Sequence, residues 1–351
     1  MKQDLKKFWK NKKVLITGHT GFKGSWLTVF LYFLGAELYG ISREEKDGIY
    51  KLASIGDLCK KEFFLDISDN NLKKLEEIVF SVKPDIVFHF AAQSLVIRGY
   101  EDPRDTVNSN INGTFNILDS INTCTTVKTL IIATTDKVYK YPEQNNSENS
   151  ELGGKDFYSA TKVSAELIIQ SFINSPKRKD LSITVVRSGN VIGGGDRAEN
   201  RLITDIVKSL MESKNFTLRM PKSVRPWQFI LDSLFGYIKI AENSYEHNES
   251  EIFNLNSELN NNYDVEMIAE IMVKKWSPKE DAIQIFKADS TEHKEVDVLR
   301  INSKKARKKL NWSAKYNIEK TVDEIINWEK NYENDSGPDY SISQVAEYLN
   351  Y

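Results

Sequence analysis

The feature that most constrains the fold is a glycine-rich turn near the start of the sequence. An apolar run at 13–17 leads into a turn with glycine at every third position: Gly18, Gly21 and Gly24. Gly18 permits a tight turn, Gly21 lets backbone N–H groups approach a pyrophosphate, and Gly24 allows close packing of a helix on a strand. The positive end of that helix favours an anion. The segment predicts a strand–turn–helix unit that binds a dinucleotide.

Short apolar runs alternate with longer amphipathic segments through the first half of the sequence. The runs are rich in Val, Ile, Leu and Phe, as expected for strands buried on both faces. The predicted strands are 13–17, 37–42, 62–66, 85–91, 129–134 and 182–187. The predicted helices are 25–34, 69–81, 106–122 and 156–174. This alternation predicts an α/β fold with a Rossmann-type, doubly wound parallel sheet.

The alternation ends after residue 187. Residues 189–196 contain four glycines, and the following sequence is polar and mostly helical. We expect residues 1–187 to form the dinucleotide-binding domain, with a return segment at about 226–256. Residues 188–225 and 257–351 are expected to form a smaller, mixed α/β C-terminal domain for the substrate.

Composition excludes several classes of partner. A net charge of −2 gives no electrostatic drive toward nucleic acid or anionic lipid, and the apolar stretch at 26–34 is too short to span a bilayer. The basic run at 304–309 is better explained as a solvated helix face. We therefore expect a small-molecule partner, no nucleic acid, no membrane and a cytoplasmic location.

Cysteine and histidine usage points to no metal site. Cys59 and Cys124 are far apart and are expected to be buried thiols in a reducing compartment. The four histidines are scattered: His19, His89, His247 and His293. His89 lies within a predicted strand, where we expect it to be packed or hydrogen-bonded.

Tyr158 and Lys162 form a candidate catalytic pair. They are four residues apart on a predicted helix and so share one face. A phenol with a pKa near 10 is a poor base, and lowering that pKa by roughly 3 units requires about 4 kcal/mol of phenolate stabilisation. An adjacent ammonium and a positive nicotinamide ring supply it in a dry site. The alternative is a surface pair, which the glycine turn disfavours.

The choice between NAD and NADP is less constrained by the residues. An acidic residue at the end of the second strand would bind ribose hydroxyls, but Arg43 stands there, and an arginine favours a 2′-phosphate. Asp66, after the third strand, is placed to meet the adenine or to cap the strand end.

Together these motifs resemble the extended short-chain dehydrogenase/reductase family over nearly the whole sequence. Residues 90–93, Phe-Ala-Ala-Gln, are similar to that family's nicotinamide-side strand. Residues 110–114 resemble its Asn-Val-x-Gly-Thr segment, in which Asn110 would support the active-site helix. The resemblance implies NAD as cofactor and a homodimer or homotetramer. It implies these cofactor-binding residues: Gly18, Thr20, Gly21, Phe22, Gly24, Asp66, Ile67, Ala91, Ala92, Tyr158 and Lys162.

A finer resemblance is carried by Thr135, Asp136 and Lys137. They stand where the nucleotide-sugar 4,6-dehydratases of this family carry a Thr-Asp-Glu or Thr-Asp-Lys triplet. The lysine form is similar to the branch that acts on CDP-glucose, as are the segments 18–27, 189–196 and 225–228. Several positions around the expected sugar-nucleotide pocket depart from that pattern: Ser94, Ile97, Gly99 and Phe229.

The resemblance implies a role for each residue. Tyr158, assisted by Lys162, takes the C4 hydroxyl proton while hydride passes to NAD, and Thr135 hydrogen-bonds the C4 oxygen. Asp136 protonates the departing C6 hydroxyl, and Lys137 acts as C5 base or its electrostatic assistant. Hydride returns to C6, giving a 4-keto-6-deoxy sugar. The expected substrate-binding residues are Gln93, Asn190, Arg201 and Arg225, the two arginines as diphosphate clamps.

Two other interpretations stay open. A nucleotide-sugar 4-epimerase would share every feature except the need for Asp136 and Lys137. A non-catalytic Rossmann protein that senses NAD(P) or binds RNA would need neither Tyr158 nor Lys162.

Overall fold

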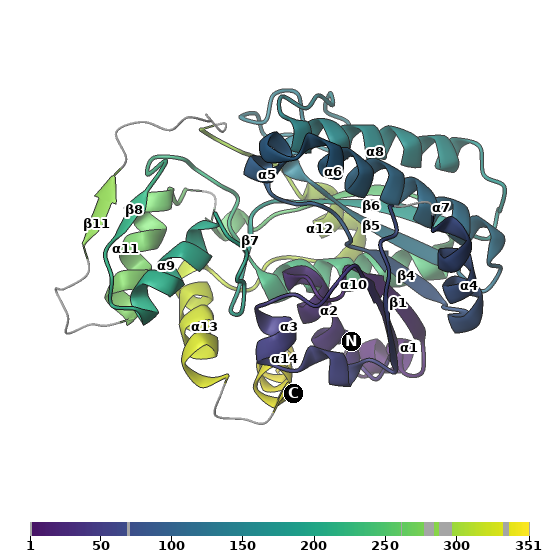
Figure 1. Cartoon of the computed structure of the whole chain (residues 1–351), viewed down its shortest axis with the longest axis horizontal. Coiled ribbons are helices and arrows are strands. Elements are labelled where there is room, and N and C mark those ends of the chain that lie inside the picture. The colour runs from purple at the N-terminus through teal and green to yellow at the C-terminus, as the bar shows by residue number, and fades with distance from the viewer. Residues whose placement is uncertain are drawn as a thin grey trace.

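The computed structural model describes residues 2–68, 71–260, 262–276, 284–287, 297–332 and 337–350. A seven-stranded sheet dominates it, in the order β3-β2-β1-β4-β5-β6-β10, and each neighbouring pair is parallel (Figure 1). The strands are β1 (Lys13–Thr17), β2 (Glu37–Ser42), β3 (Lys61–Phe64), β4 (Ile86–His89), β5 (Thr129–Thr135), β6 (Ser182–Ser188) and β10 (Ile252–Leu255). The predicted Rossmann-type fold is confirmed.

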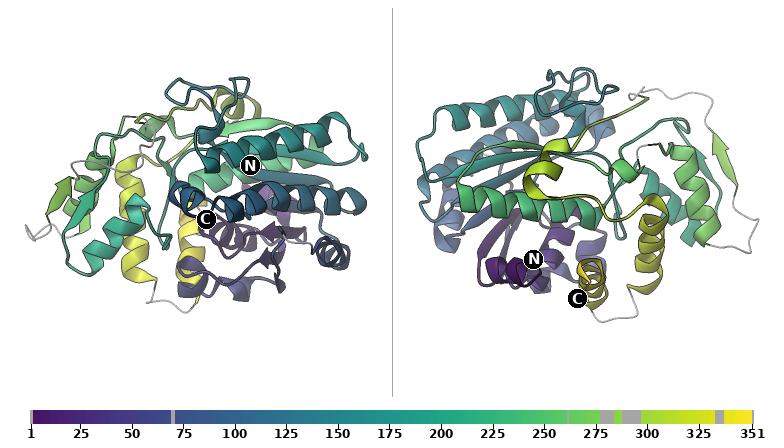
Figure 2. Two further views of the ribbon diagram at one scale, coloured as in Figure 1. Left: turned by 45° about the horizontal axis from the view of Figure 1, so that its top comes forward. Right: turned by 180° about the vertical axis from the view of Figure 1, so that it is seen from behind.

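Successive side chains of each strand enter two separate apolar cores. In β1, Val14 and Ile16 pack into one cluster while Leu15 packs into the other. The first face is covered by α1 (Lys2–Trp9), α2 (Phe22–Phe33) and α10 (Ile230–His247). The second is covered by α4 (Leu72–Val82), α7 (Gly113–Thr123) and α8 (Phe157–Asn174) (Figure 2). Burial on both faces explains why the strands are almost continuously apolar.

All six predicted strands are present, and β10 lies inside the predicted return segment together with α10. The prediction of one helix over 106–122 is wrong, because the helical segment begins earlier and is interrupted. Helix α6 (Pro103–Val107) begins earlier because the Asp102 side chain accepts a hydrogen bond from the Asp105 N–H at 2.9 Å, with proline at the first helical position. A π-helical turn, Asn108–Asn112, then separates α6 from α7.

A smaller lobe of mixed α/β structure lies at one end of the sheet (Figure 1). Its elements share a third apolar cluster. They are α9 (Leu202–Met211), β8 (Phe216–Leu218), α11 (Val265–Trp276), β11 (Ile285–Lys287) and α13 (Ile318–Asn331). Two further helices lie outside this cluster. Helix α12 (Lys304–Leu310) packs on β10, and helix α14 (Asp339–Leu349) packs on α2. The predicted domain boundaries stay a prediction.

Trp328 joins the lobe to the core of the sheet. Its fully buried ring stacks on Tyr332 at 4.7 Å between centroids, and its Nε1 donates to Ser341 Oγ at 3.0 Å. A Cβ on Gly194 would lie 2.4 Å from Trp328 Cβ. The glycine at 194 therefore lets the glycine-rich segment after β6 approach α13 closely.

Trp328→Ala is expected to lower the free energy of unfolding by about 3–5 kcal/mol, because it removes a buried indole and leaves a cavity. Urea unfolding followed by circular dichroism measures the change. Phe80→Ala, at a half-exposed ring on α4, is the control and should change stability by no more than about 0.5 kcal/mol. Equal effects of both substitutions would contradict this account of the lobe attachment.

Candidate active site

The carboxyl ends of the strands and the smaller lobe enclose a cleft of about 720 Å³. Segments that follow parallel strands meet at one edge of the sheet, next to the reversal of strand order between β1 and β4. The cleft brings together predicted residues from segments far apart in the sequence: Gly18, Gly21, Phe22, Gly24, Ala92, Thr135, Asp136, Lys137, Tyr158, Lys162, Asn190, Arg201 and Arg225.

The glycine turn is held by backbone packing. Gly18 has a φ of +76°, and a Cβ there would lie 2.7 Å from the Ala91 backbone nitrogen. A Cβ on Gly24 would lie 2.1 Å from the Gly18 oxygen. Gly21 is the N-cap of α2, and no side chain caps that helix. The helix N-terminus therefore presents N–H groups in a cradle that fits a pyrophosphate.

A second cavity, of about 130 Å³, shares Gly18 and Gly21 with the cleft. It is lined by the remaining predicted cofactor residues: Thr20, Asp66, Ile67 and Ala91. The Thr20 hydroxyl donates to the Glu44 oxygen at 2.9 Å, which ties the turn to the segment after β2. Its position next to the pyrophosphate cradle suits the adenosine half of a dinucleotide.

Helix α8 positions the Tyr158/Lys162 pair. Asp156 caps the helix in a capping box with Ser159, and this fixes its start one turn before Lys162. Both Tyr158 and Lys162 are buried, and the Thr135 side chain hydrogen-bonds to the phenol. The pair therefore faces the end of β5, as its spacing predicts.

The protein alone does not make Tyr158 a base. Burial raises the pKa of the Tyr158 phenol to about 12, although the interaction with the Thr135 side chain acts in the opposite direction. Burial lowers the pKa of Lys162 to about 8, while the charge of Glu166 opposes this. Lys162 therefore stays mostly protonated at neutral pH, and a further positive charge is required before Tyr158 ionises.

A buried ion pair lies behind Lys162. Arg187 Nη2 is 2.5 Å from Glu166 Oε2, and both side chains are fully buried. Thr134 Oγ1 donates to Glu166 Oε1 at 2.6 Å, so the pair joins α8 to β5 and β6. Removing one partner would leave an uncompensated buried charge.

Asp136 has the environment of a general acid. Its carboxyl is 3 % exposed, and burial raises its pKa, although Lys137 and the hydrogen bond from Thr135 oppose the shift. Its Oδ2 is buried and has no hydrogen-bond partner among the described residues. Lys137 follows it in the cleft wall. This arrangement favours a protonated carboxyl that faces a ligand.

Three of the four predicted substrate residues line the cleft, and the fourth, Gln93, does not. Asn190, Arg201 and Arg225 line the cleft, and Arg201 is held by Asp196 Oδ2 at 2.7 Å. Gln93 is not among the described residues that line either cavity. Its Nε2 donates instead to Thr106 Oγ1 at 2.8 Å and to the Leu95 oxygen. Gln93 thus ties the segment after β4 to α6, which disfavours a substrate role.

Two supporting predictions are confirmed. Asn110 Nδ2 donates to Thr161 Oγ1 at 2.9 Å, so it holds the active-site helix. His89 is buried and bridges Thr17 Oγ1 at 2.7 Å and Thr114 Oγ1 at 3.1 Å. Burial, with Lys162 as a smaller contribution, lowers the pKa of His89 to about 3 and keeps it neutral.

Sequence reasoning missed Lys23. This partly buried side chain lines the cleft, and its Nζ donates to Ser188 Oγ at 2.7 Å. Burial and the charge of Arg201 lower the pKa of Lys23 to about 7, while Asp136 opposes the shift. The available signal was a basic residue inside the glycine turn.

Sequence reasoning also missed the role of His19, which lies inside the same glycine turn. It is fully buried, its Nδ1 lies 3.0 Å from Ser42 Oγ, and its Nε2 lies 2.7 Å from Glu62 Oε1. A Cβ on Gly40 would lie 2.3 Å from the imidazole. His19 therefore fixes the glycine turn to β2 and β3, and it requires glycine at position 40.

The described residues contain no group of three His, Cys, Asp or Glu side chains that could hold a metal ion. His293 lies outside them. No helix within the described ranges is long and apolar enough to cross a membrane. Both Cys59 and Cys124 are free; Cys124 is buried and Cys59 partly so.

Both the sequence and the fold are similar to those of known proteins. A family model described as GDP-mannose 4,6 dehydratase matches residues 15–325. A CDP-glucose 4,6-dehydratase of Salmonella typhimurium is 35% identical over 337 residues, covering 93% of this chain and 92% of the relative. In fold, the chain is similar to a dTDP-glucose 4,6-dehydratase of Bacillus anthracis, with a TM-score of 0.75 at 20% identity over 92% of this chain and 98% of that one. A UDP-glucose 4-epimerase of Thermotoga maritima gives 0.78 at 20% identity, over 90% and 98%.

The sheet order, the glycine turn and the Tyr158/Lys162 pair define an extended short-chain dehydrogenase/reductase. Within that class, the chain belongs to the GDP-mannose 4,6-dehydratase family of nucleotide-sugar enzymes.

In the dinucleotide-free protein, Tyr158 should stay protonated at pH values above the pKa of a free tyrosine, which is near 10. The reason is that burial disfavours the phenolate. Carbon NMR of Cζ-labelled tyrosine follows the titration, and Tyr158→Phe assigns the resonance. The Tyr158 resonance should show no titration midpoint below pH 10.5 (roughly the free-tyrosine range). A midpoint near neutrality would mean that the protein ionises Tyr158 without a cofactor.

Proposed function

We propose that this chain is an NAD-dependent 4,6-dehydratase that converts CDP-glucose to CDP-4-keto-6-deoxyglucose. The observation that carries the proposal is Asp136, a buried carboxyl with a raised pKa and an unpartnered oxygen in the cleft shared with Tyr158. The similarity to the Salmonella typhimurium enzyme supports CDP-glucose as the substrate.

The residues present fit a bound dinucleotide. The glycine cradle and the uncapped N-terminus of α2 would hold its pyrophosphate, and Asp66 and Ile67 would line its adenosine half. When bound, NAD supplies a hydride acceptor at C4 of the sugar and returns the same hydride to C6. The nicotinamide charge would also supply the stabilisation that Tyr158 lacks in the free protein.

Tyr158 and Lys162 would act in the first step. As hydride leaves C4, the phenolate of Tyr158 takes the hydroxyl proton, and Lys162 stabilises the phenolate. Thr135, which already contacts the phenol, would hydrogen-bond the C4 oxygen. The Glu166–Arg187 pair behind Lys162 would keep the ammonium in place.

Asp136 and Lys137 would act in the elimination. Oxidation at C4 makes the C5 proton acidic, and Lys137 would remove it as the C6 oxygen leaves with a proton from Asp136. One water is released across C5 and C6. Because Asp136 must be protonated, this step should slow as pH rises through its raised pKa. Lys137 would then return its proton to C5 as the hydride is delivered to C6, which would complete the reaction.

A nucleotide-sugar 4-epimerase is the second candidate, since the fold is shared with one. An epimerase returns hydride to C4 and needs no acid near C6. A buried carboxyl with one unpartnered oxygen in the cleft shared with Tyr158 would then have a desolvation cost and no function, so Asp136 favours the dehydratase. The formed cleft and the buried Tyr158/Lys162 pair disfavour a non-catalytic sensor.

We also propose that Arg201 and Arg225 clamp the diphosphate and that the chain forms a homodimer or homotetramer. Large apolar side chains are exposed on α6, α7 and α8, where a second copy would cover them: Val107, Phe115, Phe157 and Leu167. The free thiols of Cys59 and Cys124 suit the reducing cytoplasm.

The purified protein with catalytic NAD should consume CDP-glucose and release a 4-keto-6-deoxy product without net NADH formation, because hydride leaves and returns within each turnover. The measurement is the absorbance of the 4-ketone in base, with mass and NMR identification, for CDP-, dTDP-, UDP- and GDP-sugars in parallel. Tyr158→Phe should abolish turnover.

A galactose-type product would overturn this proposal in favour of an epimerase. Stoichiometric NADH accumulation would indicate a simple dehydrogenase. Faster turnover of another nucleotide sugar would replace CDP-glucose and leave the reaction type intact.

Asp136→Asn should lower turnover by about 10²- to 10⁴-fold, the usual contribution of a general acid, while C4 oxidation persists. Bound NADH should then accumulate on mixing with substrate, and deuterium from solvent should still enter C5. Lys137→Met should suppress C5 exchange if Lys137 is the base. Lys140→Met, at an exposed lysine paired with Glu151, is the matched control. Normal rates in both site variants would exclude the dehydratase mechanism.

A further inference from the structure

The end of β2 carries a cation where a dinucleotide fold of this kind usually carries an acid. Arg43 follows β2 and lines the smaller cavity, next to Ser42 and Asp66. By itself, a guanidinium there would favour a dinucleotide with a 2′-phosphate. The proposed function, in contrast, uses NAD. The conflict is resolved by what surrounds Arg43.

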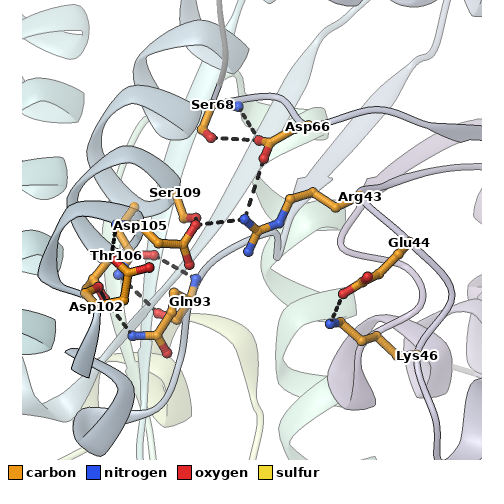
Figure 3. A network of polar contacts seen from close by, with 11 residues as sticks. Arg43, Glu44, Lys46, Asp66, Ser68, Gln93, Asp102, Asp105, Thr106 and Ser109 are labelled. Carbon is orange, nitrogen blue, oxygen red and sulfur yellow. Dashed lines mark hydrogen bonds and ion pairs between the residues drawn. The ribbon is translucent and has the colours of Figure 1, made fainter. Parts of the chain in front are cut away.

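Two carboxylates from other segments hold the Arg43 guanidinium. Its Nη1 lies 2.7 Å from Asp105 Oδ1 and 3.4 Å from Asp66 Oδ2. Figure 3 shows Arg43 reaching from the β2 side toward Asp105 on α6 and Asp66 after β3. The Nη1 group is thus directed at two carboxylates and is not left for a phosphate.

Both carboxylates are themselves fixed. Asp66 Oδ1 accepts hydrogen bonds from the Ser68 N–H at 2.8 Å and from its hydroxyl at 2.6 Å. The Asp105 N–H donates to the N-cap Asp102, and Asp105 Oδ1 accepts from Ser109 Oγ at 3.3 Å. Partial burial would raise the pKa of Asp105, but the hydrogen bond and charge of Arg43 hold it below its usual value. Asp105 is therefore ionised at neutral pH.

The charges of the wider cluster balance. Lys46 pairs with Glu44, and Arg98 acts on both Glu44 and Asp105. With the charge of Arg98 counted, the cluster contains three positive side chains, Arg43, Lys46 and Arg98, and three carboxylates, Glu44, Asp66 and Asp105. A 2′-phosphate would bring about two further negative charges into a cluster with no surplus positive charge. A ribose hydroxyl meets no such opposition.

We infer that Asp105 determines the choice of dinucleotide: by neutralising Arg43 from α6, it makes the site select NAD and reject NADP. The inference rests on the proposed function only in requiring that the two cavities bind a dinucleotide. The acid that is missing from the end of β2 is supplied by a helix more than sixty residues later in the chain.

The test is isothermal titration calorimetry of NAD and NADP, separately, with cofactor-stripped protein and no sugar present. Asp105→Asn keeps the shape and removes the charge. It should shift the ratio of the NADP to the NAD dissociation constants toward NADP by about tenfold or more, equivalent to roughly 1.4 kcal/mol. Glu101→Gln is the matched control: it makes the same change in net charge at an exposed residue four positions away.

A double variant identifies the group that is released. Adding Arg43→Ala to Asp105→Asn should remove the gain in NADP affinity, because Arg43 would be the cation that binds the 2′-phosphate. Thermal unfolding and circular dichroism verify that each variant is folded. A folded Asp105→Asn variant with a ratio within twofold of the wild type would overturn the inference, as would a wild type that binds NADP as tightly as NAD.

These outcomes separate the inference from the proposed function. NAD binding with an unchanged ratio would overturn the role of Asp105 and leave the dehydratase proposal standing. A wild-type protein that binds neither dinucleotide would overturn both. An equal shift in Glu101→Gln would reduce the effect to net charge and would likewise exclude a specific role for Asp105.

Discussion

The close approach of three backbone segments at the glycine turn is the constraint on which the rest of the site depends. The start of α2 lies against Gly18, and Gly18 lies against the segment after β4, with no room for a Cβ at Gly18 or Gly24. This contact leaves the N-terminus of α2 uncapped and directed at the edge of the sheet. The cleft, the smaller cavity next to it and the position of Lys23 all follow from it.

A second constraint is the handling of buried charge. The Glu166–Arg187 pair is fully buried, yet its geometry and its bond to Thr134 compensate for desolvation and fix α8 against β5 and β6. Asp136, which follows β5, has one buried oxygen with no hydrogen-bond partner among the described residues, and burial raises its pKa although Lys137 and Thr135 oppose the shift. The Glu166 carboxyl thus serves to fix helix α8, whereas the raised pKa of Asp136 suits a proton donor.

Much of the fold could be predicted because the central strands are buried on both faces and therefore consist mostly of apolar residues. The helix around residue 106 could not be predicted correctly, because a cap at Asp102 and a π-helical turn depend on local geometry that periodicity does not carry. Within the site, the spacing of Tyr158 and Lys162 predicted that they share a helix face, and the residues at the end of β5 were candidates through a family resemblance. Gln93 was assigned to the substrate, but its amide is bound by Thr106, a contact made only when α6 folds over the segment after β4.

The sequence by itself determined the order of strands and helices along the chain and the glycine turn, since each lies in a local pattern. The spacing of Tyr158 and Lys162 pointed to a catalytic pair, whereas Thr135, Asp136 and Lys137 were candidates through a family resemblance. Only the tertiary structure decided their ionisation, because pKa depends on burial and on neighbours that are distant in the chain. It also decided the meaning of Arg43. The sequence shows a cation at the end of β2, whereas the fold brings Asp105 and Asp66 against it and cancels its charge.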